Sequence, residues 1–418
     1  MTATGLPTAP AAHRPAHRDP NVLRWLAAYA CSMVGDSVYY LALSWAAVQA
    51  GSPAQAGIVM SVSALPRAVL MLFGGVVADR LGPRRVVIGS DAVRCAAVLA
   101  VAALLFLTSP GLWPLAVLAL VFGTVDAVFM PAVGALPARV TSHDQLARVQ
   151  GMRGLVIRLS YVVGAPLGGL GVAVGGAAAA FCLAGLLIAV SVPLLVSLRV
   201  RELPAEDRSA APTRAPTPWQ DLRAGLTYTR RHRVLAPLML AIALGDLGFV
   251  GPLNVGLTLL ADRRGWGAAG MGWVLAGCGV GAGCASMLLT VRGRLPRAGL
   301  VAACTILAGS VAIGALALVP GLVGAVVVAL LVGLLAGLSG ALCQAMLQTE
   351  TEPGYLGRVS AVSGLVSLGL APLSMPVSAA AVGAYGTTPV YVVSAAVCGL
   401  GGVVALVAPG VRRAELPR

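Results

Sequence analysis

The sequence is organised around residues 75–85, GVVADRLGPRR, a short charged stretch between two long apolar runs. One aspartate and three arginines lie within residues 79–85, whereas the flanking residues 55–78 and 86–107 contain as charges only Arg67, Asp91 and Arg94. A helix of about 20 apolar residues crosses the hydrocarbon core of a bilayer. The pattern therefore predicts two membrane helices that meet at a tight basic turn.

The composition excludes a soluble globular protein. Of the 418 residues, 58% are hydrophobic and 11% charged, and the mean hydropathy is +0.89. The apolar runs lack the alternation of a β-barrel, which leaves a helical bundle. We predict an all-α protein with twelve spans, at residues 23–49, 55–78, 86–108, 112–137, 149–172, 176–198, 234–259, 268–291, 298–319, 322–347, 358–382 and 389–408.

The charges predict the orientation of the chain in the cell membrane. All 29 basic residues are arginine, and those outside the spans gather in alternate loops and in both tails, with Arg263 and Arg264 as the exception. We therefore expect both termini in the cytoplasm. The net charge of +14 is then a topology signal, and we expect no nucleic-acid partner. The eight cysteines lie in apolar runs without C-x-x-C spacing, so neither a metal site nor a disulfide is expected.

The chain divides near its middle. We predict a disordered tail over residues 1–21 that is not a signal peptide, a first six-helix bundle over 22–198, a second over 234–408, and a cytoplasmic tail over 409–418. Residues 199–233 form a linker rich in proline and charge. Trp219, Leu222 and Leu226 have helical spacing there, which fits either an interfacial helix or a plain solvated linker.

The two halves resemble each other. When the chain is shifted by 210 residues, Gly35-Asp36 falls on Gly245-Asp246 and Pro166 on Pro376. The segment LARVQGMRGLV from Leu146 falls on LGRVSAVSGLV from Leu356. We infer two copies of one six-helix unit.

The spacing Gly-x-x-x-Asp-Arg-x-Gly-x-Arg-Arg in residues 75–85 resembles the signature loop between helices 2 and 3 of the major facilitator superfamily, and departs from it at Pro83, where a basic residue is usual. Further segments resemble the exporter branch that includes macrolide and enterobactin efflux proteins: Leu65-Pro66, Asp91-x-x-Arg94, FMPAVGALPARV from Phe129, and the LGRV at Leu356. The resemblance covers nearly the whole chain and implies the major facilitator fold.

The resemblance also implies two mechanical elements. Asp79 would hold a cytoplasmic gate shut by pairing with arginine, within a gate motif of Gly75, Asp79, Arg80, Gly82, Arg84, Arg85, Asp91 and Arg94. The stretch GAPLGG resembles the Gly-Pro motif at which antiporter members hinge, and it contributes Gly164, Pro166, Gly168 and Gly169. Plain close packing explains these small residues equally well.

Charges inside spans are expensive and therefore functional candidates. From the rise per residue, Asp36 and Arg67 lie at about 18 to 20 Å and could pair, as could Asp126 and Arg158 at about 15 to 17 Å. Asp246 has no arginine in the spans of its half, so it is our first candidate for carrying a proton. The resemblance places spans 1, 4, 7 and 10 around a cavity and adds Gln344. Alternatively, all three aspartates are structural.

These features predict a secondary active transporter, a proton-coupled exporter of a drug-like compound or secondary metabolite that works by alternating access. The alternatives are an importer or facilitator of a small nutrient on the same fold, and a membrane sensor or scaffold that transports nothing. The expected partners are an amphiphilic small molecule and the bilayer, with no obligate protein partner. We find no nucleotide-binding or catalytic motif, and expect neither an enzyme nor a cofactor beyond the proton gradient.

Overall fold

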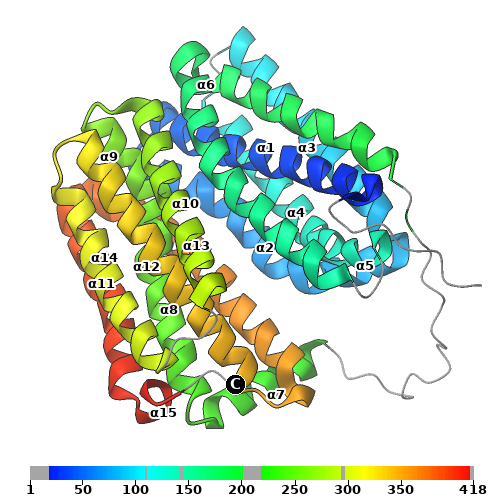
Figure 1. Cartoon of the computed structure of the whole chain (residues 1–418). Helices are drawn as coiled ribbons and strands as arrows, with labels where there is room; N and C mark the ends of the chain where they lie inside the picture. Colours follow the sequence, from blue (N-terminus) through cyan, green and yellow to red (C-terminus); the bar gives the residue numbers. More distant parts are fainter. Residues whose placement is uncertain are drawn as a thin grey trace, which may run out of the picture.

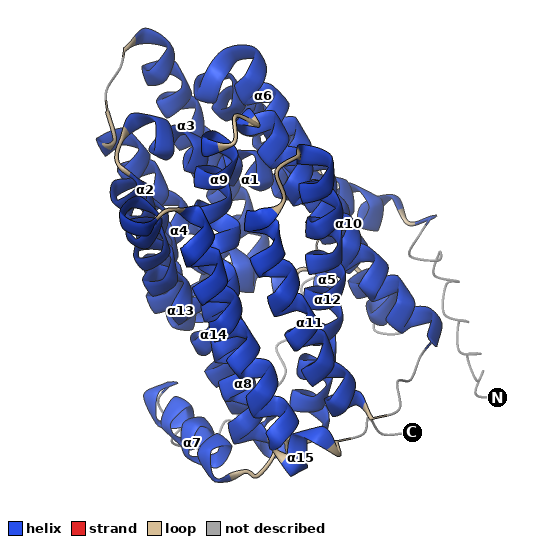
Figure 2. Cartoon of the chain, turned by 90° about the vertical axis from the view of Figure 1, so that its left-hand side faces the viewer, coloured by secondary structure: helices blue, strands red, loops and turns tan. Residues whose placement is uncertain are grey.

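The structure, a computed structural model, describes residues 18–108, 111–141, 145–198, 200, 218–292 and 297–414. In this part of the chain the regular structure is helical and no strand occurs (Figures 1 and 2). Ten of the described helices are long and apolar enough to cross a membrane. The predicted all-α membrane fold is therefore confirmed.

The first half contains six helices: α1 (Pro20–Ala50), α2 (Pro53–Leu81), α3 (Pro83–Leu107), α4 (Trp113–Ala135), the short α5 (Pro137–Val140) and α6 (Leu146–Val196). Helix α6 is broken by non-helical backbone at Gly175 and Gly176. The break lies at the predicted boundary between the spans 149–172 and 176–198. Helix α2 is not among the ten apolar helices, and α6 is counted there as one.

Local signals explain where these helices begin. Ser52 and Gln55 form a capping box at the start of α2. A single residue, Gly82, joins α2 to α3, and its φ of 83° lies in the region that favours glycine. Pro83 follows as the first residue of α3, where proline is favoured because it has no N–H to leave unbonded. The departure from the family signature therefore coincides with a helix start.

The second half follows the linker. It contains α8 (Leu235–Gly251), the π-helical η4 (Pro252–Gly256), α9 (Leu257–Arg263), α10 (Gly267–Arg292), α11 (Ala298–Leu318), α12 (Leu322–Thr349), the 3-10 turn η5 (Pro353–Tyr355), α13 (Leu356–Tyr385), α14 (Thr387–Val407) and α15 (Pro409–Arg412). The predicted span 234–259 corresponds to α8, η4 and α9 in succession. The Tyr391 hydroxyl donates to the Pro252 carbonyl oxygen at 2.9 Å and so ties α14 to the π-helix.

The end of the linker is helical. Helix α7 (Pro218–Arg231) packs against the start of α13. The rings of Tyr228 and Tyr355 are stacked with centroids 4.4 Å apart, and Gly225 lies against the backbone of Arg358. Linker residues 201–217 are outside the described part.

Two helix pairs join the halves, α2 with α13 and α6 with α10. A Cβ atom at Gly57 of α2 would lie 2.8 Å from Pro376 Cα, and one at Gly272 of α10 would lie 3.2 Å from Pro166 Cα. Because Pro166 and Pro376 are equivalent in the predicted repeat, the two interfaces are copies of each other. Glycine lets the backbones approach this closely.

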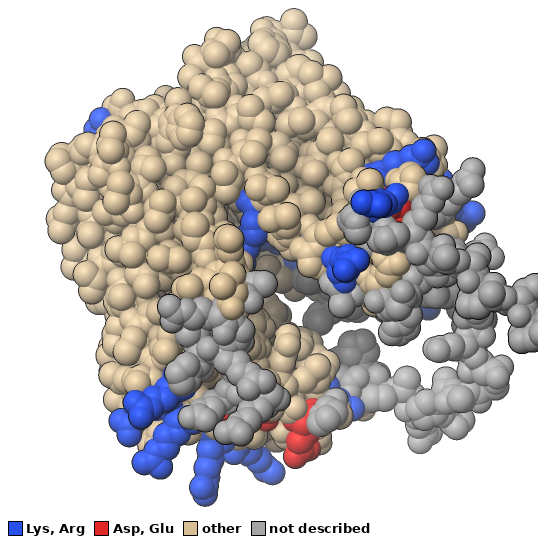
Figure 3. Space-filling view, viewed as in Figure 1, with Lys and Arg blue, Asp and Glu red and all other residues tan. Residues whose placement is uncertain are grey.

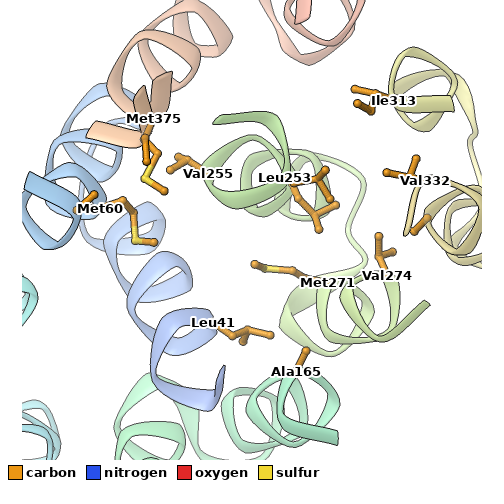
Figure 4. Packing of buried hydrophobic residues seen from close by; sticks show 14 of the residues in the cluster. Leu41, Met60, Ala165, Leu253, Val255, Met271, Val274, Ile313, Val332 and Met375 are labelled. Carbon is orange, nitrogen blue, oxygen red and sulfur yellow. The ribbon is translucent and has the colours of Figure 1, made fainter. Parts of the chain in front are cut away.

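The two halves are in contact with each other at one end of the bundle. The Ser44 and Thr258 hydroxyls are 2.6 Å apart, and Gln49 Nε2 donates to Asp262 Oδ1 at 2.8 Å. We call this the closed end, and the end that carries α5, α7 and α15 the open end. One hydrophobic core contains residues of both halves, and Figure 4 shows part of it between α1, α2, α6, α10 and α13.

Towards the open end the two lobes separate, and Figure 3 shows the surface hollowed between them. Most of the visible surface carries no charge, and arginines gather near the open end (Figure 3). Exposed apolar side chains include Leu107, Val174 and Val323, each at least 80% exposed. A surface of this kind requires lipid around it.

The structure corrects one register of the predicted repeat. Gly35 packs against Ala184 and Ile188, and the same contact is made in the second half by Gly248 with Ser394 and Cys398. Phe249, which follows Gly248, is therefore the counterpart of Asp36. Asp246 lies three residues earlier, close to one helical turn nearer the open end. The shared Gly-Asp dipeptide is thus a coincidence of sequence, because α8 is displaced along its axis relative to α1.

Candidate functional site

A buried ionic cluster lies inside the first half, centred on Arg94 of α3. Arg94 Nη1 donates to Asp36 Oδ1 and Oδ2 of α1 at 3.0 and 2.8 Å and to Asp126 Oδ1 of α4 at 3.2 Å. Arg94 Nη2 bonds to Asp91 of its own helix and to Ser32 Oγ of α1, the latter at 3.0 Å. Asp91 also accepts a hydrogen bond from Ser191 of α6. Helices α1, α3 and α4 therefore meet at one guanidinium group, and α6 joins them through Asp91.

Two aromatic rings and a second arginine complete the cluster. The guanidinium carbon of Arg94 lies 3.9 Å from the centroid of the Phe129 ring, a cation–π contact. Tyr40 donates to Asp126 Oδ2 at 3.1 Å. Arg67 Nη1 of α2 donates to the Tyr40 hydroxyl at 3.3 Å and lies 3.8 Å from Asp126 Oδ2.

The charges in this cluster do not balance. Three carboxylates, from Asp36, Asp91 and Asp126, face two guanidinium groups, from Arg67 and Arg94, so the formal sum is one negative charge when all are ionised. The Arg94 side chain is 0% exposed and that of Asp36 13%. Buried charges persist only when they are paired and hydrogen-bonded. A surplus carboxylate in such a place is suited to taking up and releasing one proton.

Both predicted ion pairs were wrong. Asp36 pairs with Arg94 and not with Arg67, and Asp126 pairs with Arg94 and Arg67 and not with Arg158. The pairs were inferred from depth along each helix, and depth does not say which helices are neighbours. Helix α2 packs on α4, whereas α6 packs on α1 and α10, so Arg67 meets Asp126 and half-buried Arg158 does not.

Sequence reasoning also misplaced Asp91 and Arg94, which it assigned to the gate motif at the loop. Arg94 lies eleven residues after Pro83, the first residue of α3, and therefore about 16 Å along the helix. Depth along the helix, the argument that selected Asp36, therefore also places Arg94 inside the membrane span. Both Asp91 and Arg94 were assigned to the gate motif because they follow the charged turn closely in sequence.

The other gate residues lie at the open end. Arg84 donates to the carbonyl oxygens of Leu195 and Val196, at 3.4 and 2.5 Å, and so ties the start of α3 to the end of α6. Arg80 and Arg85 are exposed. The surroundings of Gly75 and the side chain of Asp79 lie outside the described part of the structure.

The predicted hinge residues lie where α6 meets two other helices. Gly164 and Gly168 face α1, and a Cβ at Gly168 would lie 3.2 Å from Val38 Cα. Gly169 faces α10, where a Cβ would lie 2.5 Å from the Ala268 carbonyl oxygen. Pro166 contacts Gly272 of α10, as described above. The motif therefore holds α6 close to helices of both halves at once.

In the second half the only charged member of our candidate set is Asp246 of α8. Its Oδ2 is buried and has no hydrogen-bond partner among the described residues, while the Ser367 side chain of α13 forms a hydrogen bond with the carboxylate. Gln344 of α12 is exposed. No group of three or more His, Cys, Asp or Glu side chains that could hold a metal ion occurs in the described residues.

The fold and this site define a class. Two similar bundles of apolar helices, joined closely at one end and hollowed between them at the other, surround charged side chains buried at mid-depth. The profile of the Major Facilitator Superfamily matches residues 25–372. The chain belongs to this superfamily of transporters and is a multi-pass protein of the cell membrane.

Similar proteins include exporters. The chain is 27% identical over 403 residues to the multidrug efflux pump Tap of Mycolicibacterium fortuitum, covering 91% of this chain and 94% of that protein. It is 25% identical over 345 residues to the enterobactin exporter EntS of Escherichia coli O139:H28, covering 79% and 80%. The predicted resemblance to the drug and siderophore exporter branch is thereby confirmed.

Solved structures agree in fold. The crystal structure of the nucleoside transporter NupG aligns with a TM-score of 0.69 at 14% identity, over 93% of this chain and 98% of that one. A POT family transporter in complex with 5-aminolevulinic acid aligns with a TM-score of 0.71 at 12% identity, over 93% and 96%. At this identity the likeness concerns the fold alone.

Proposed function

We propose that the protein is a proton-driven exporter that moves an amphiphilic cationic or neutral compound out of the cell by alternating access, with twelve spans, cytoplasmic termini and no cofactor. The observation that carries the proposal is the Arg94 cluster, in which carboxylates outnumber guanidinium groups by one inside a membrane bundle. An uncompensated charge in a low-dielectric environment lowers stability, so a cluster with a purely structural role would be expected to balance its charges. The exporter relatives support the direction of transport.

The distribution of arginine supports the orientation. Exposed arginines of α7 and α15 and of the α2–α3 turn lie at the open end, and they include Arg80, Arg85, Arg223, Arg230, Arg231, Arg412 and Arg413. Arginine-rich ends of membrane helices stay in the cytoplasm. With that orientation the hollow opens inward, so the structure corresponds to the state that loads cargo.

Two places could carry the proton. The first is Asp246, whose Oδ2 has no partner among the described residues. The second is Asp36, the most exposed of the three carboxylates around Arg94, because a proton there removes the surplus charge. In our proposal, cargo enters the hollow, the proton leaves one of these acids on the cytoplasmic side, and the halves then rock to open the other face.

The remaining candidates receive mechanical roles in this proposal. Asp79 and the arginines of the α2–α3 turn hold the open end shut in the alternate state. The GAPLGG stretch acts as the pivot, since Gly168 and Gly169 keep α6 in contact with α1 and α10. The contacts at the closed end, Ser44 with Thr258 and Gln49 with Asp262, must break when that end opens.

Transport in sealed liposomes tests the proposal. Purified protein is reconstituted, an acidic lumen is imposed, and accumulation of ethidium, a fluorescent lipophilic cation, is followed. We expect accumulation that collapses with the pH gradient and that Asp246→Asn or Asp36→Asn reduces at least tenfold. Asp19→Asn is the matched control, because Asp19 caps α1 and asparagine caps equally well. If ethidium, a macrolide and a siderophore all fail to move and no proton flux follows, the protein is not such an exporter.

A further inference from the structure

A cavity of about 190 Å³ lies inside the second half, between α8, α11, α12 and α14. Asp246 and Phe249 of α8, Ile306 and Gly309 of α11, and Ala336 of α12 lie on its wall. The cavity is distinct from the hollow between the halves, because all of its wall comes from helices of one bundle. Its origin becomes clear when the bundle is compared with the first half.

The backbone contacts give the register for this comparison. Helix α3 begins at Pro83 and α11 at Ala298, so Arg94 and Gly309 are both eleven residues from the helix start. In agreement with this, Leu99 packs on Gly185 of α6, and Gly314 faces Ala395 of α14. Gly309 is therefore the counterpart of Arg94.

The same procedure places α12 against α4. Gly123 of α4 lies against the backbone of Ser63, and Gly333 of α12 lies against that of Cys278. Ala336 is thus the counterpart of Asp126. With Phe249 as the counterpart of Asp36, the structure has glycine, alanine and phenylalanine where the first half has its central ion cluster.

The cavity therefore occupies the place that the Arg94 side chain fills in the first half. Around Arg94 lie Asp36, Asp91, Asp126, Phe122 and Phe129. Their counterparts all line the cavity: Phe249, Ile306, Ala336, Val332 and Ser339. The second half thus has a cavity at the position of the Arg94 guanidinium group, but Gly309 supplies no side chain to fill it.

One negative charge remains on the wall of this cavity. Asp246 lines it, and Asp246 Oδ2 is buried without a hydrogen-bond partner among the described residues. No ion pair of Asp246 occurs in that part of the chain either. Asp246 as a whole is half-buried, and Ser367 of α13 supplies one hydrogen bond to its carboxylate. A carboxylate in an apolar wall without a counter-charge is still costly, so the cavity favours an occupant with a single positive charge.

We propose that the Asp246 cavity binds a flat organic monocation of the amidinium or guanidinium class, with a small apolar body. A planar amidinium can donate two parallel hydrogen bonds to a carboxylate, and the Phe249 ring on the wall offers a cation–π contact. A protein cavity of about 150 Å³ holds benzene, so 190 Å³ has room for a ring with an amidinium group. The inference rests on the proposed export function in that such cations would be a class of cargo.

Binding to the purified full-length protein in detergent tests the inference without any gradient. The probe is benzamidine, a cation at neutral pH, and its neutral analogue benzamide is the matched ligand control. We expect calorimetry and thermal shift to detect benzamidine and not benzamide. Asp246→Asn should weaken binding at least tenfold, whereas Asp19→Asn should leave it unchanged.

Two further variants keep the inference falsifiable if Asp246→Asn folds poorly. Ala336→Leu fills the cavity without changing charge and should abolish benzamidine binding. Gly309→Arg supplies the missing guanidinium from the chain itself, and should abolish binding while raising the melting temperature. Equal affinity for benzamide, unchanged affinity in Ala336→Leu, or no binding to the wild type would each overturn the inference. Binding without transport would refute the export function alone, and transport without binding would refute only this site.

Discussion

Removal of Arg94 gives the sharpest test of the ionic cluster. In Arg94→Met the side-chain volume is largely kept, while the bonds to Asp36 at 3.0 and 2.8 Å and to Asp126 at 3.2 Å are lost. The three carboxylates then face Arg67 alone, so the formal surplus rises from one negative charge to two. Removing one partner of a buried ion pair costs about 3–5 kcal/mol, and we expect a loss of folding free energy of that order.

A second substitution distinguishes loss of charge balance from loss of packing. Asp36→Asn added to Arg94→Met returns the surplus to one, so the double variant should be more stable than Arg94→Met alone. Residues in one ionic network show coupling energies of about 0.5–3 kcal/mol, and we expect a value near the upper end. Folding free energies come from equilibrium unfolding in mixed detergent micelles.

The control is Arg85→Met, because Arg85 is an exposed arginine of the same helix. Its effect should stay within about 0.5 kcal/mol, as for most surface substitutions. If the effects of Arg94→Met and Asp36→Asn simply add, or if Arg94→Met is as stable as Arg85→Met, then the cluster is not held together by charge and the argument for a surplus carboxylate fails with it.

Three further predictions concern contacts between helices. Gly272→Ala places a methyl group 2.6 Å from the Ala165 carbonyl oxygen, and this overpacking should lower the unfolding free energy by about 1–3 kcal/mol. The control is Gly134→Ala, where a Cβ meets nothing within 4 Å, and it should be neutral or stabilising by up to about 1 kcal/mol. Equal melting temperatures for the two variants would contradict the close approach of α10 to α6. Asp262→Ala removes the acceptor of the Gln49 hydrogen bond at the closed end. Losing this bond should destabilise the closed conformation by about 0.5–1.5 kcal/mol and so raise the fraction of molecules open at that end roughly two- to tenfold, as measured by spin-label distances. An unchanged distance distribution would mean that the bond does not hold this end closed. Tyr391→Phe leaves the Pro252 carbonyl oxygen without its donor and should lower the unfolding free energy by about 1–3 kcal/mol. A variant as stable as the wild type would show that this bond does not stabilise the π-helix.

The helices could be predicted from the sequence because their signals are local. Each apolar run has the length that a bilayer requires, and the predicted boundaries agree with α3, α4, α11 and α12 to within about four residues. The break in α6 at Gly175 and Gly176 lies at the boundary predicted between the spans 149–172 and 176–198. The family also followed from local spacing, in the GVVADRLGPRR stretch.

The pairing of charges could not be predicted, because it depends on which helices are neighbours and which way each one faces. Hydropathy gave the depth of Asp36, Arg67 and Asp126, but the packing of α3 between α4 and α6 brought Arg94 to them. The shift between α1 and α8, which separates Asp246 from the position of Asp36, was likewise invisible in the shared Gly-Asp dipeptide. Sequence alone determined the helices and their lengths, since these depend on contacts with lipid, and the family, since its signature is a local spacing of residues. Only the tertiary structure decided which carboxylates are balanced and where a guanidinium is missing, since these depend on contacts between helices far apart in the chain.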